Sequence, residues 1–172
     1  SDFEIMAPVG SYESLHAAIE AGTDAVYFGV EGLNMRSRSS NNFTLDDLRA
    51  IAATCNVHGV KTYLTVNTVI YDDDIEKCHA IIDAAREAGI TAIIASDVAA
   101  ILYARSVGVE VHISTQVNVT NIEAVKFYSQ YADVVVLARE VDLDRVGEIH
   151  RQIMEQGITG PHGEPVKIEM FC

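Results

Sequence analysis

Short apolar runs rich in β-branched residues alternate along the chain with longer segments of helical period. This alternation is typical of βα units, in which helices connect parallel strands. Residues that favour helix starts, such as Thr44 and Asp97, precede helical segments, and Gly89 and Gly157 follow two of them. We expect strands at Glu4–Pro8, Ala25–Gly29, Lys61–Val66, Ala92–Ala95, Glu110–Ile113, Asp133–Leu137 and Lys167–Phe171. We expect helices near Tyr12–Ala21, Leu45–His58, Asp74–Ala88, Val98–Ser106, Asn121–Gln130 and Asp142–Gln156.

A weak internal repeat favours a closed barrel over an open sheet. The segment 21–27 is echoed by 88–94 and again by 131–136, two βα units apart each time. The units between them carry a different version at 58–60 and 107–109. Alternation of neighbouring units suits a TIM-type (β/α) barrel, in which odd and even strands fill alternate interior layers. An open doubly wound sheet is the alternative, but it would more often have a glycine-rich phosphate loop after its first strand.

The length of the chain suggests an incomplete barrel. A complete (β/α)₈ barrel typically needs about 250 residues and eight units. The chain has 172 residues, and its predicted elements stop at a seventh strand. We therefore expect residues 1–172 to be the N-terminal portion of a (β/α)₈-barrel catalytic domain, truncated after the seventh strand, with the remainder in a longer parent protein.

The composition and charge of the chain argue against direct binding of membranes, nucleic acids and metals. Hydrophobic residues make up 49% and charged residues 22% of the chain, without a run long enough for a membrane span or the pattern of a signal peptide. A cytoplasmic location and no membrane partner are the resulting expectations. The net charge of −13 repels phosphate backbones, so basic contacts to any nucleic acid would come from elsewhere. The three cysteines and six histidines show no metal-ligand spacing, and no metal site is expected in this chain.

Polar residues follow the predicted strands, where parallel βα folds build their active sites. Asn67 and Asp97 follow the third and fourth strands. The period-two pattern places Tyr63, Thr65 and Asn67 on one side of the third strand. It likewise places His112, Ser114 and Gln116 on one side of the fifth strand, before Asn118, and Arg139 and Glu140 follow the sixth. We predict catalytic roles for Asp97, Gln116, Arg139 and Glu140, and substrate-binding roles for Arg36, Arg38, Asn67, His112, Ser114 and Asn118.

Each of these residues also has an ordinary structural interpretation. Asp97 can cap the helix that follows it. Asn67 and Asn118 are common turn residues. Arg139 and Glu140 can form a surface ion pair, and His112 can be a hydrogen-bonded core histidine. It is their coincidence at one edge of the predicted sheet that indicates a site.

The segment 31–44 is the longest predicted loop after a strand. It contains Arg36 and Arg38, and arginine can bind a carboxylate or phosphate through two parallel hydrogen bonds. The loop is therefore a candidate anion clamp, with a solvated polar loop as the alternative. No Ser-His-Asp order, His-Glu-x-x-His motif or nucleophile elbow is present in the chain.

The residues at the strand ends resemble those of a known family. The chain is similar to the N-terminal part of the collagenase-like peptidase family, peptidase family U32, over essentially its whole length. The more specific segments are His112 to Asn118, with the sequence HISTQVN, and Val136 to Glu140, with the sequence VLARE. Further matching segments are 7–11, 24–29, 34–36, 42–44, 65–68, 96–97 and 168–171.

The resemblance implies a bacterial barrel enzyme whose activity is described in two ways. The family takes its name from a collagenase, whereas several relatives are required for oxygen-independent hydroxylation of a tRNA or rRNA base or of a quinone precursor. Those relatives are associated with an iron–sulfur cluster and some of them with prephenate. In the family, the cysteines that bind the cluster follow the position of Cys172. The resemblance therefore implies no cofactor in this chain and an iron–sulfur cluster only in the intact parent.

Three functions are compatible with the sequence. In the first, the parent is an iron–sulfur RNA hydroxylase that binds RNA and a small anionic cosubstrate such as prephenate. Arg36, Arg38 and Arg139 would hold the cosubstrate in that case, and the 172 residues alone would be inactive. In the second, the parent is a peptidase, that is a hydrolase, with metal-activated water. In the third, the chain is a non-catalytic binding or assembly module that forms a homo-oligomer or contacts the missing C-terminal part.

Overall fold

The computed structural model describes residues 4–32 and 43–170 of the chain. Strands and helices alternate in the predicted order. The strands are β1 (Met6–Pro8), β2 (Ala25–Gly29), β3 (Lys61–Val66), β4 (Ala92–Ala95), β5 (Val111–Ile113), β6 (Val134–Val136) and β7 (Lys167–Glu169). The α-helices are α1 (Tyr12–Glu20), α2 (Leu45–Val57), α3 (Ile75–Ala88), α4 (Val98–Ser106), α5 (Ile122–Ser129) and α6 (Leu143–Gln156). Two 3₁₀ turns, η1 (Asp72–Asp74) and η2 (Thr115–Val117), were not predicted.

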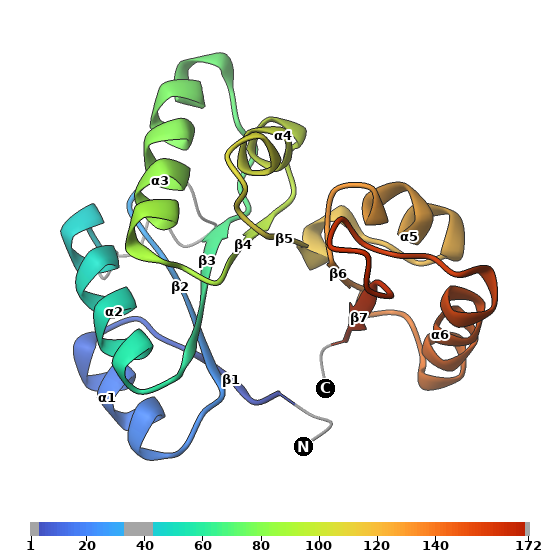
Figure 1. Cartoon of the computed structure of the whole chain (residues 1–172), viewed down its shortest axis with the longest axis horizontal. Coiled ribbons are helices and arrows are strands. Elements are labelled where there is room, and N and C mark those ends of the chain that lie inside the picture. The colour runs from blue at the N-terminus through green and yellow to red at the C-terminus, as the bar shows by residue number, and fades with distance from the viewer. Residues whose placement is uncertain (1–3, 33–42, 171–172) are drawn as a thin grey trace. The chain divides into compact units, whose positions relative to one another are not determined.

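The first compact unit extends to Val109 and contains a parallel sheet of β1, β2, β3 and β4 in chain order. Helices α1, α2 and α3 lie next to one another along one face of these strands (Figure 1). Leu64 of β3 and Ile93 of β4 are completely buried, as are Leu48 of α2 and Ile82 of α3. The main core of this unit therefore lies between the sheet and its helices.

The other face of this sheet carries a smaller cluster of side chains. Tyr63 is 3% exposed and packs with Ala25 and Ala92 of the neighbouring strands. Met6, Tyr27 and Ile94 pack against this group. Successive residues of β3 thus alternate between the two faces, with Leu64 in the main core and Tyr63 on the other face, as expected for a strand.

The second compact unit begins at Glu110 and contains the parallel strands β5, β6 and β7 with helices α5 and α6. Ile113 and Val135 are completely buried, and Ile153 of α6 is nearly so. Between α6 and β7 the chain folds back on itself through an antiparallel bridge of Thr159 with Pro165. This connection brings residues 158–166 to the amino ends of β5 and β6, where Lys167 N donates to the Asp133 carbonyl.

The helix boundaries agree with the local signals in the sequence. Thr44 forms a capping box with Asp47, and Asp97 caps α4. Gly89 and Gly157 end α3 and α6 with φ of 76° and 62°. Seven parallel strands alternating with helices confirm the predicted TIM-type (β/α) barrel architecture up to its seventh strand. Within residues 4–32 and 43–170, no helix combines the length and the apolar character needed to span a membrane.

Candidate functional site

The carboxyl ends of the strands in the first unit become polar, as predicted. Thr65 donates its hydroxyl hydrogen bond to the Phe28 carbonyl at 3.1 Å. Ser96 Oγ donates to the Asn67 carbonyl at 3.0 Å, which fixes the end of β3 to the end of β4. Asn67 is partly buried at this edge. The structure thus places the predicted Asn67 beside the loop that leads to Asp97.

Asp97 uses both of its carboxylate oxygens to bind backbone amides. Its Oδ1 accepts from Ala99 N at 2.9 Å, which caps α4, and its Oδ2 accepts from Ile70 N at 2.9 Å. The carboxylate therefore connects the start of α4 to the loop that follows β3. Both contacts stabilise the local backbone, and a catalytic role for Asp97 stays a prediction. In such a role, the carboxylate would already accept hydrogen bonds from two backbone amides.

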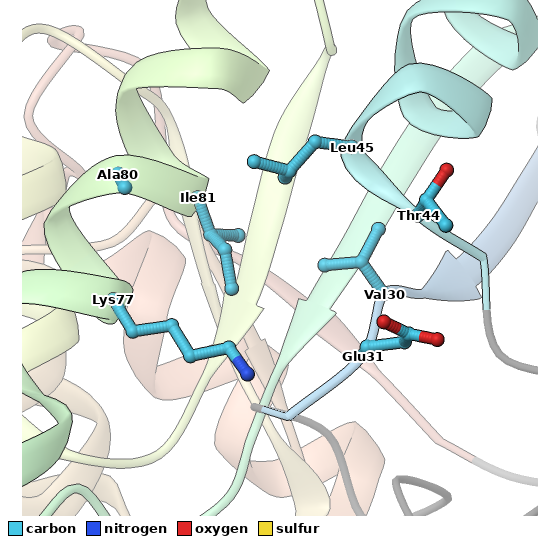
Figure 2. Close-up of a pocket in the computed structure, with 7 residues that line it drawn as sticks. All are labelled: Val30, Glu31, Thr44, Leu45, Lys77, Ala80 and Ile81. Atoms are coloured by element: carbon cyan, nitrogen blue, oxygen red, sulfur yellow. The ribbon is translucent and has the colours of Figure 1, made fainter.

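A pocket of about 240 Å³ lies at the carboxyl end of β2, on its helix-facing side. It is lined by Val30, Glu31, Thr44, Leu45, Lys77, Ala80 and Ile81 (Figure 2). Lys77 extends from α3 toward the chain that follows β2, so that a Cβ built on Gly32 would lie only 2.0 Å from Lys77 Nζ. Lys77 Nζ is the end of a flexible side chain and could move away from such a Cβ, whereas the φ of 99° at Gly32 favours glycine. The pocket thus combines apolar walls with one amine and one carboxylate.

The predicted anion clamp begins and ends beside this pocket. A parallel bridge joins Val30 to Phe43, so the two ends of the long loop after β2 lie together. Phe43 also packs edge-on against Phe28 and Tyr12. Arg36 and Arg38 lie outside the described residues, and their role as an anion clamp stays a prediction.

In the second unit, the segment after β5 forms a tight turn instead of continuing as a strand. Ser114 is 3% exposed and caps η2, with Ser114 Oγ accepting from Gln116 N at 3.3 Å. Asn118 ends the turn with φ of 60°, in the left-handed region. The predicted strand alternation through Ser114 and Gln116 was therefore wrong, because β5 ends at Ile113 and the chain turns there. Gln116 and Asn118 are both exposed.

Arg139 and Glu140 lie at the same edge of the second unit as this turn. Val119, next to Asn118, forms a parallel bridge with Leu137, and Ala138 N donates to the Val119 carbonyl at 2.9 Å. Arg139 and Glu140 follow directly and are exposed. The structure thus brings Gln116, Asn118, Arg139 and Glu140 to one edge, which we call the 116–140 edge. Amide and guanidinium groups of this kind can bind a carboxylate or phosphate.

The described contact of His112 lies at the amino end of β5 and not at the 116–140 edge. Its ring is 5% exposed, and its Nε2 lies 2.9 Å from Glu110 Oε2 at the amino end of β5. This hydrogen bond lowers the pKa of Glu110, against the opposing effect of burial and with further lowering from His162 and Lys167. The described contact of His112 therefore favours its interpretation as a hydrogen-bonded core histidine. Its predicted role in substrate binding stays untested.

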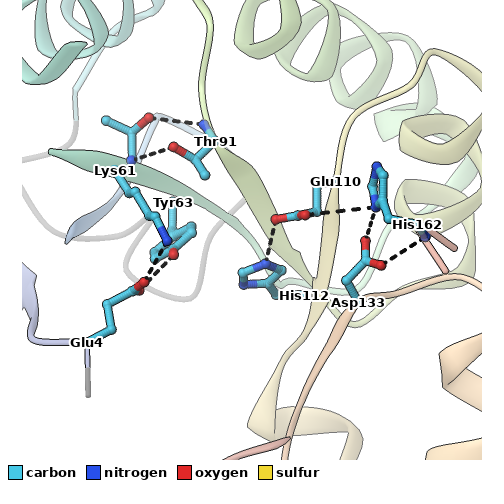
Figure 3. Close-up of polar contacts among 9 residues, drawn as sticks. Glu4, Lys61, Tyr63, Thr91, Glu110, His112, Asp133 and His162 are labelled. Carbon is cyan, nitrogen blue, oxygen red and sulfur yellow. Dashed lines mark hydrogen bonds and ion pairs between the residues drawn. The ribbon is translucent and has the colours of Figure 1, made fainter. Parts of the chain in front are cut away.

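Glu110 belongs to a cluster that the sequence did not reveal. Glu110, Asp133 and His162 bring one ligand atom each to within 4.8 Å of one another (Figure 3). His162 Nδ1 lies 2.5 Å from Asp133 Oδ2 and 4.0 Å from Glu110 Oε1. The three residues come from three separate segments, so no spacing pattern could have indicated the cluster.

The two described cysteines offer no reactive thiolate. Cys55 and Cys78 are buried in α2 and α3. Desolvation raises the pKa of both thiols, and it brings that of Cys78 to about 11 together with the charges of Asp97 and Asp74. An iron–sulfur cluster of the cubane type needs about four thiolates. These two buried thiols, on helices that pack against the sheet, do not fit such a cluster.

Comparison with known proteins identifies relatives of two kinds. The model of the family described as Peptidase family U32 matches residues 10–171. A collagenase of Porphyromonas gingivalis is 66% identical over 172 residues, which are 100% of this chain and 42% of the relative. A 23S rRNA 5-hydroxycytidine synthase of Escherichia coli is 33% identical over 86% of this chain and 22% of the relative. A tRNA hydroxylation protein of Bacillus subtilis is 32% identical over 87% of this chain and 36% of the relative.

The fold has a solved counterpart. The structure of a U32 peptidase superposes with a TM-score of 0.70 over 99% of this chain and 68% of that chain, at 14% sequence identity. At this identity the likeness concerns the fold. The chain spans less than half the length of the three curated relatives named above.

Proposed function

This chain belongs to peptidase family U32, and we propose that it forms part of the barrel of an enzyme that hydroxylates a base in tRNA or rRNA. Two relatives at about one-third identity are named for such modifications. The observation that carries the proposal is the 116–140 edge, with its exposed amides, guanidinium and carboxylate. This is a set of groups that binds and orients polar molecules.

The contacts described for histidines and cysteines favour this proposal over hydrolysis by a serine, threonine or cysteine nucleophile. Such hydrolysis needs a hydroxyl or thiol activated by a neighbouring base. The described contacts of His112 and His162 are with carboxylates and that of His58 is with the Thr54 carbonyl, and none of these contacts joins an imidazole to a hydroxyl or thiol. Cys55 and Cys78 are buried with a raised thiol pKa.

In the proposed enzyme, Arg139 binds the anionic group of a small cosubstrate through charge-assisted hydrogen bonds. Gln116 and Asn118 orient the same molecule from the neighbouring turn, and Glu140 fixes the position of the arginine. Arg36 and Arg38 would add charge from the loop after β2.

The described thiols do not fit an iron–sulfur cluster, so the ligands of any cluster would lie outside residues 4–32 and 43–170. We therefore expect the 172-residue chain by itself to lack hydroxylase activity. With a net charge of −13, it is also a poor surface for RNA. Both properties support the proposal that hydroxylation requires more than these 172 residues.

A peptidase is the second candidate function. It is favoured by the 66% identity to a collagenase, which covers the whole chain. In the absence of a visible activated nucleophile among the described residues, such an enzyme would have to activate water with a metal ion. The two candidates differ in product, so they can be separated directly.

The test compares cells that lack the gene with cells that carry it. Total tRNA and rRNA are digested to nucleosides and analysed by mass spectrometry for a pyrimidine nucleoside that has gained one oxygen atom. We expect this nucleoside to disappear on deletion and to return when the natural gene is restored. Unchanged nucleosides, together with cleavage of a defined collagen peptide by the purified protein, would replace the hydroxylase proposal with the peptidase.

A further inference from the structure

The cluster of Glu110, Asp133 and His162 lies at the amino ends of the strands in the second unit. Glu110 directly precedes β5, Asp133 directly precedes β6, and His162 lies in the connection that leads to β7. The 116–140 edge is at the opposite, carboxyl ends of β5 and β6. In TIM-type barrels the carboxyl ends carry catalysis and the amino ends contribute stability. A ligand at this cluster would therefore act on structure.

We propose that Glu110, Asp133 and His162 form a structural binding site for a divalent zinc ion. The donors are two carboxylate oxygens and one imidazole nitrogen, all of which are zinc ligands in proteins. Zinc binds each of them at about 2.0–2.2 Å, so two donors of one ion lie no more than about 4 Å apart. His162 Nδ1 lies 2.5 Å from Asp133 Oδ2 and 4.0 Å from Glu110 Oε1, and the three ligand atoms all lie within 4.8 Å of one another, so small side-chain shifts would bring them around one ion.

The carboxylates of the site are held in place by surrounding groups. The buried ring of His112 contacts Glu110 Oε2 at 2.9 Å, while the other oxygen, Oε1, lies on the side of His162 (Figure 3). Asp133 Oδ1 accepts from His162 N at 3.2 Å, which leaves Oδ2 for the imidazole. A hydrogen-bonded carboxylate that presents one free oxygen is the arrangement found around protein-bound metals.

The backbone also approaches the site closely. A Cβ built on Gly160 would lie 2.5 Å from Asp133 Oδ1 and 2.9 Å from Asp133 Cα. Glycine at this position therefore allows the connection to pack directly on Asp133. Gly160 N donates to the Glu164 carbonyl at 2.9 Å, which closes the turn that carries His162.

The charges around the site suit a cation. Two carboxylates face one imidazole, whose exposed fraction of 59% leaves a route for an ion from solvent. The described cation that acts electrostatically on Glu110, besides the two histidines, is Lys167 at the start of β7. Zinc binds deprotonated imidazole and carboxylate groups, so binding should weaken as the pH falls.

Zinc binding would attach the connection between α6 and β7 more firmly to the strands of the second unit. Residues 158–166 join α6 to β7, and their tip is attached to the sheet by the contacts of His162 with Asp133 and Glu110 and by backbone hydrogen bonds. A metal shared by β5, β6 and this connection would join three segments that are distant in sequence. Binding to the folded state alone raises stability by mass action.

The test is titration of the chain with zinc chloride at neutral pH, followed by calorimetry and by thermal unfolding. The Cys172→Ser variant serves as the parent, so that this thiol does not contribute. We expect one zinc ion per chain and a higher unfolding temperature with zinc. His162→Ala and Asp133→Asn should weaken binding at least about tenfold. His150→Ala is the matched control, because His150 is an exposed histidine on α6 of the same unit.

The outcomes separate clearly. Loss of zinc binding in His162→Ala and Asp133→Asn, with retention in His150→Ala, supports the site. Binding that is equal in His162→Ala and its parent would place the ion elsewhere and overturn the proposal. Absence of zinc binding in the parent would overturn it too, and would leave the cluster as a set of polar contacts between the three side chains. Neither result affects the proposed RNA hydroxylation.

Discussion

Asp47 shows how a single carboxylate joins two helices of the first unit. Its Oδ2 accepts from Thr44 N at 2.8 Å and completes the capping box of α2. Its Oδ1 accepts from the Tyr12 hydroxyl of α1 at 2.5 Å. The hydrogen bond from Tyr12 lowers the pKa of Asp47, with a second lowering from Thr44, and it raises the pKa of Tyr12.

These shifts predict a pH window for stability. The lowered pKa of Asp47 stabilises the fold above its ordinary value of 3.8, and this contribution is lost as the pH falls through the folded value. The raised pKa of Tyr12 stabilises the fold below 10.0, and this contribution is lost as the pH rises through the folded value. Tyr12→Phe keeps the ring contact with Phe43 but removes the hydroxyl, and should cost less than about 1 kcal/mol at neutral pH.

The measurement is urea unfolding of the chain and of Tyr12→Phe at pH 7 and at pH 3. The difference between them should be larger at pH 7, where Asp47 is ionised, than at pH 3. Asp47→Asn should show the same trend, because it removes the titrating group. A difference that is unchanged at pH 3 would contradict the assignment of the window to this pair.

Single residues were predictable from the sequence where their partners are close in the chain. Thr44 and Asp97 were recognised as helix caps, and both cap a helix in the structure. The contact of Asp97 with Ile70 N depends on the packing of two loops and could not be predicted. The same holds for His162, which reaches Glu110 and Asp133 only after β5, β6 and the connection to β7 have come together.

At the level of elements, the segment after β5 differs from its prediction, because a 3₁₀ turn takes the place of the expected strand-like alternation. Apolar and polar residues alternate through HISTQVN as they would in a strand, but the chain leaves the sheet after Ile113. Ser114 begins the 3₁₀ turn by accepting from Gln116 N, and Asn118 ends it in the left-handed region. Alternation alone does not detect such a turn, because the left-handed residue is Asn and not Gly.

Substitutions at Asn118 test this geometry. A β-branched residue with φ of 60° is strained, so Asn118→Val should lower the free energy of unfolding by about 1–2 kcal/mol. Asn118→Gly should leave stability close to that of the parent, because glycine adopts positive φ without a steric penalty. The free energies come from urea denaturation of the two variants. Equal stability of Asn118→Val and Asn118→Gly would show that the turn does not require a left-handed residue.

The other elements were predictable because their signals are local. Strand-length runs such as KTYLTV and helix-length segments with caps and terminal glycines gave the parallel βα order. Their pairing followed from the chirality and adjacency that βα units impose. The predicted site residues were brought together only in part. Gln116, Asn118, Arg139 and Glu140 share an edge, whereas the described contact of His112 is with Glu110 at the other end of β5.

At the level of the whole molecule, two functional regions are proposed at opposite ends of the strands of the second unit. The 116–140 edge, at the carboxyl ends, supplies exposed polar groups for an anionic cosubstrate. The Glu110–Asp133–His162 cluster, at the amino ends, supplies ligands for a structural zinc ion. The net charge of −13 makes this chain by itself a poor surface for the phosphate backbone of RNA.

The central claim is that the 116–140 edge serves RNA hydroxylation, and substitution of Arg139 tests it most directly. Cells that lack the gene are complemented with the natural protein, with Arg139→Ala or with Arg145→Ala, and the hydroxylated nucleoside is quantified. Arg145 is a matched control, since it is an exposed arginine on α6 of the same unit. We predict that Arg139→Ala lowers the hydroxylated nucleoside about tenfold or more, as expected for loss of a charged hydrogen bond, and that Arg145→Ala leaves it unchanged. Equal levels in cells with Arg139→Ala and with the natural protein would contradict the account.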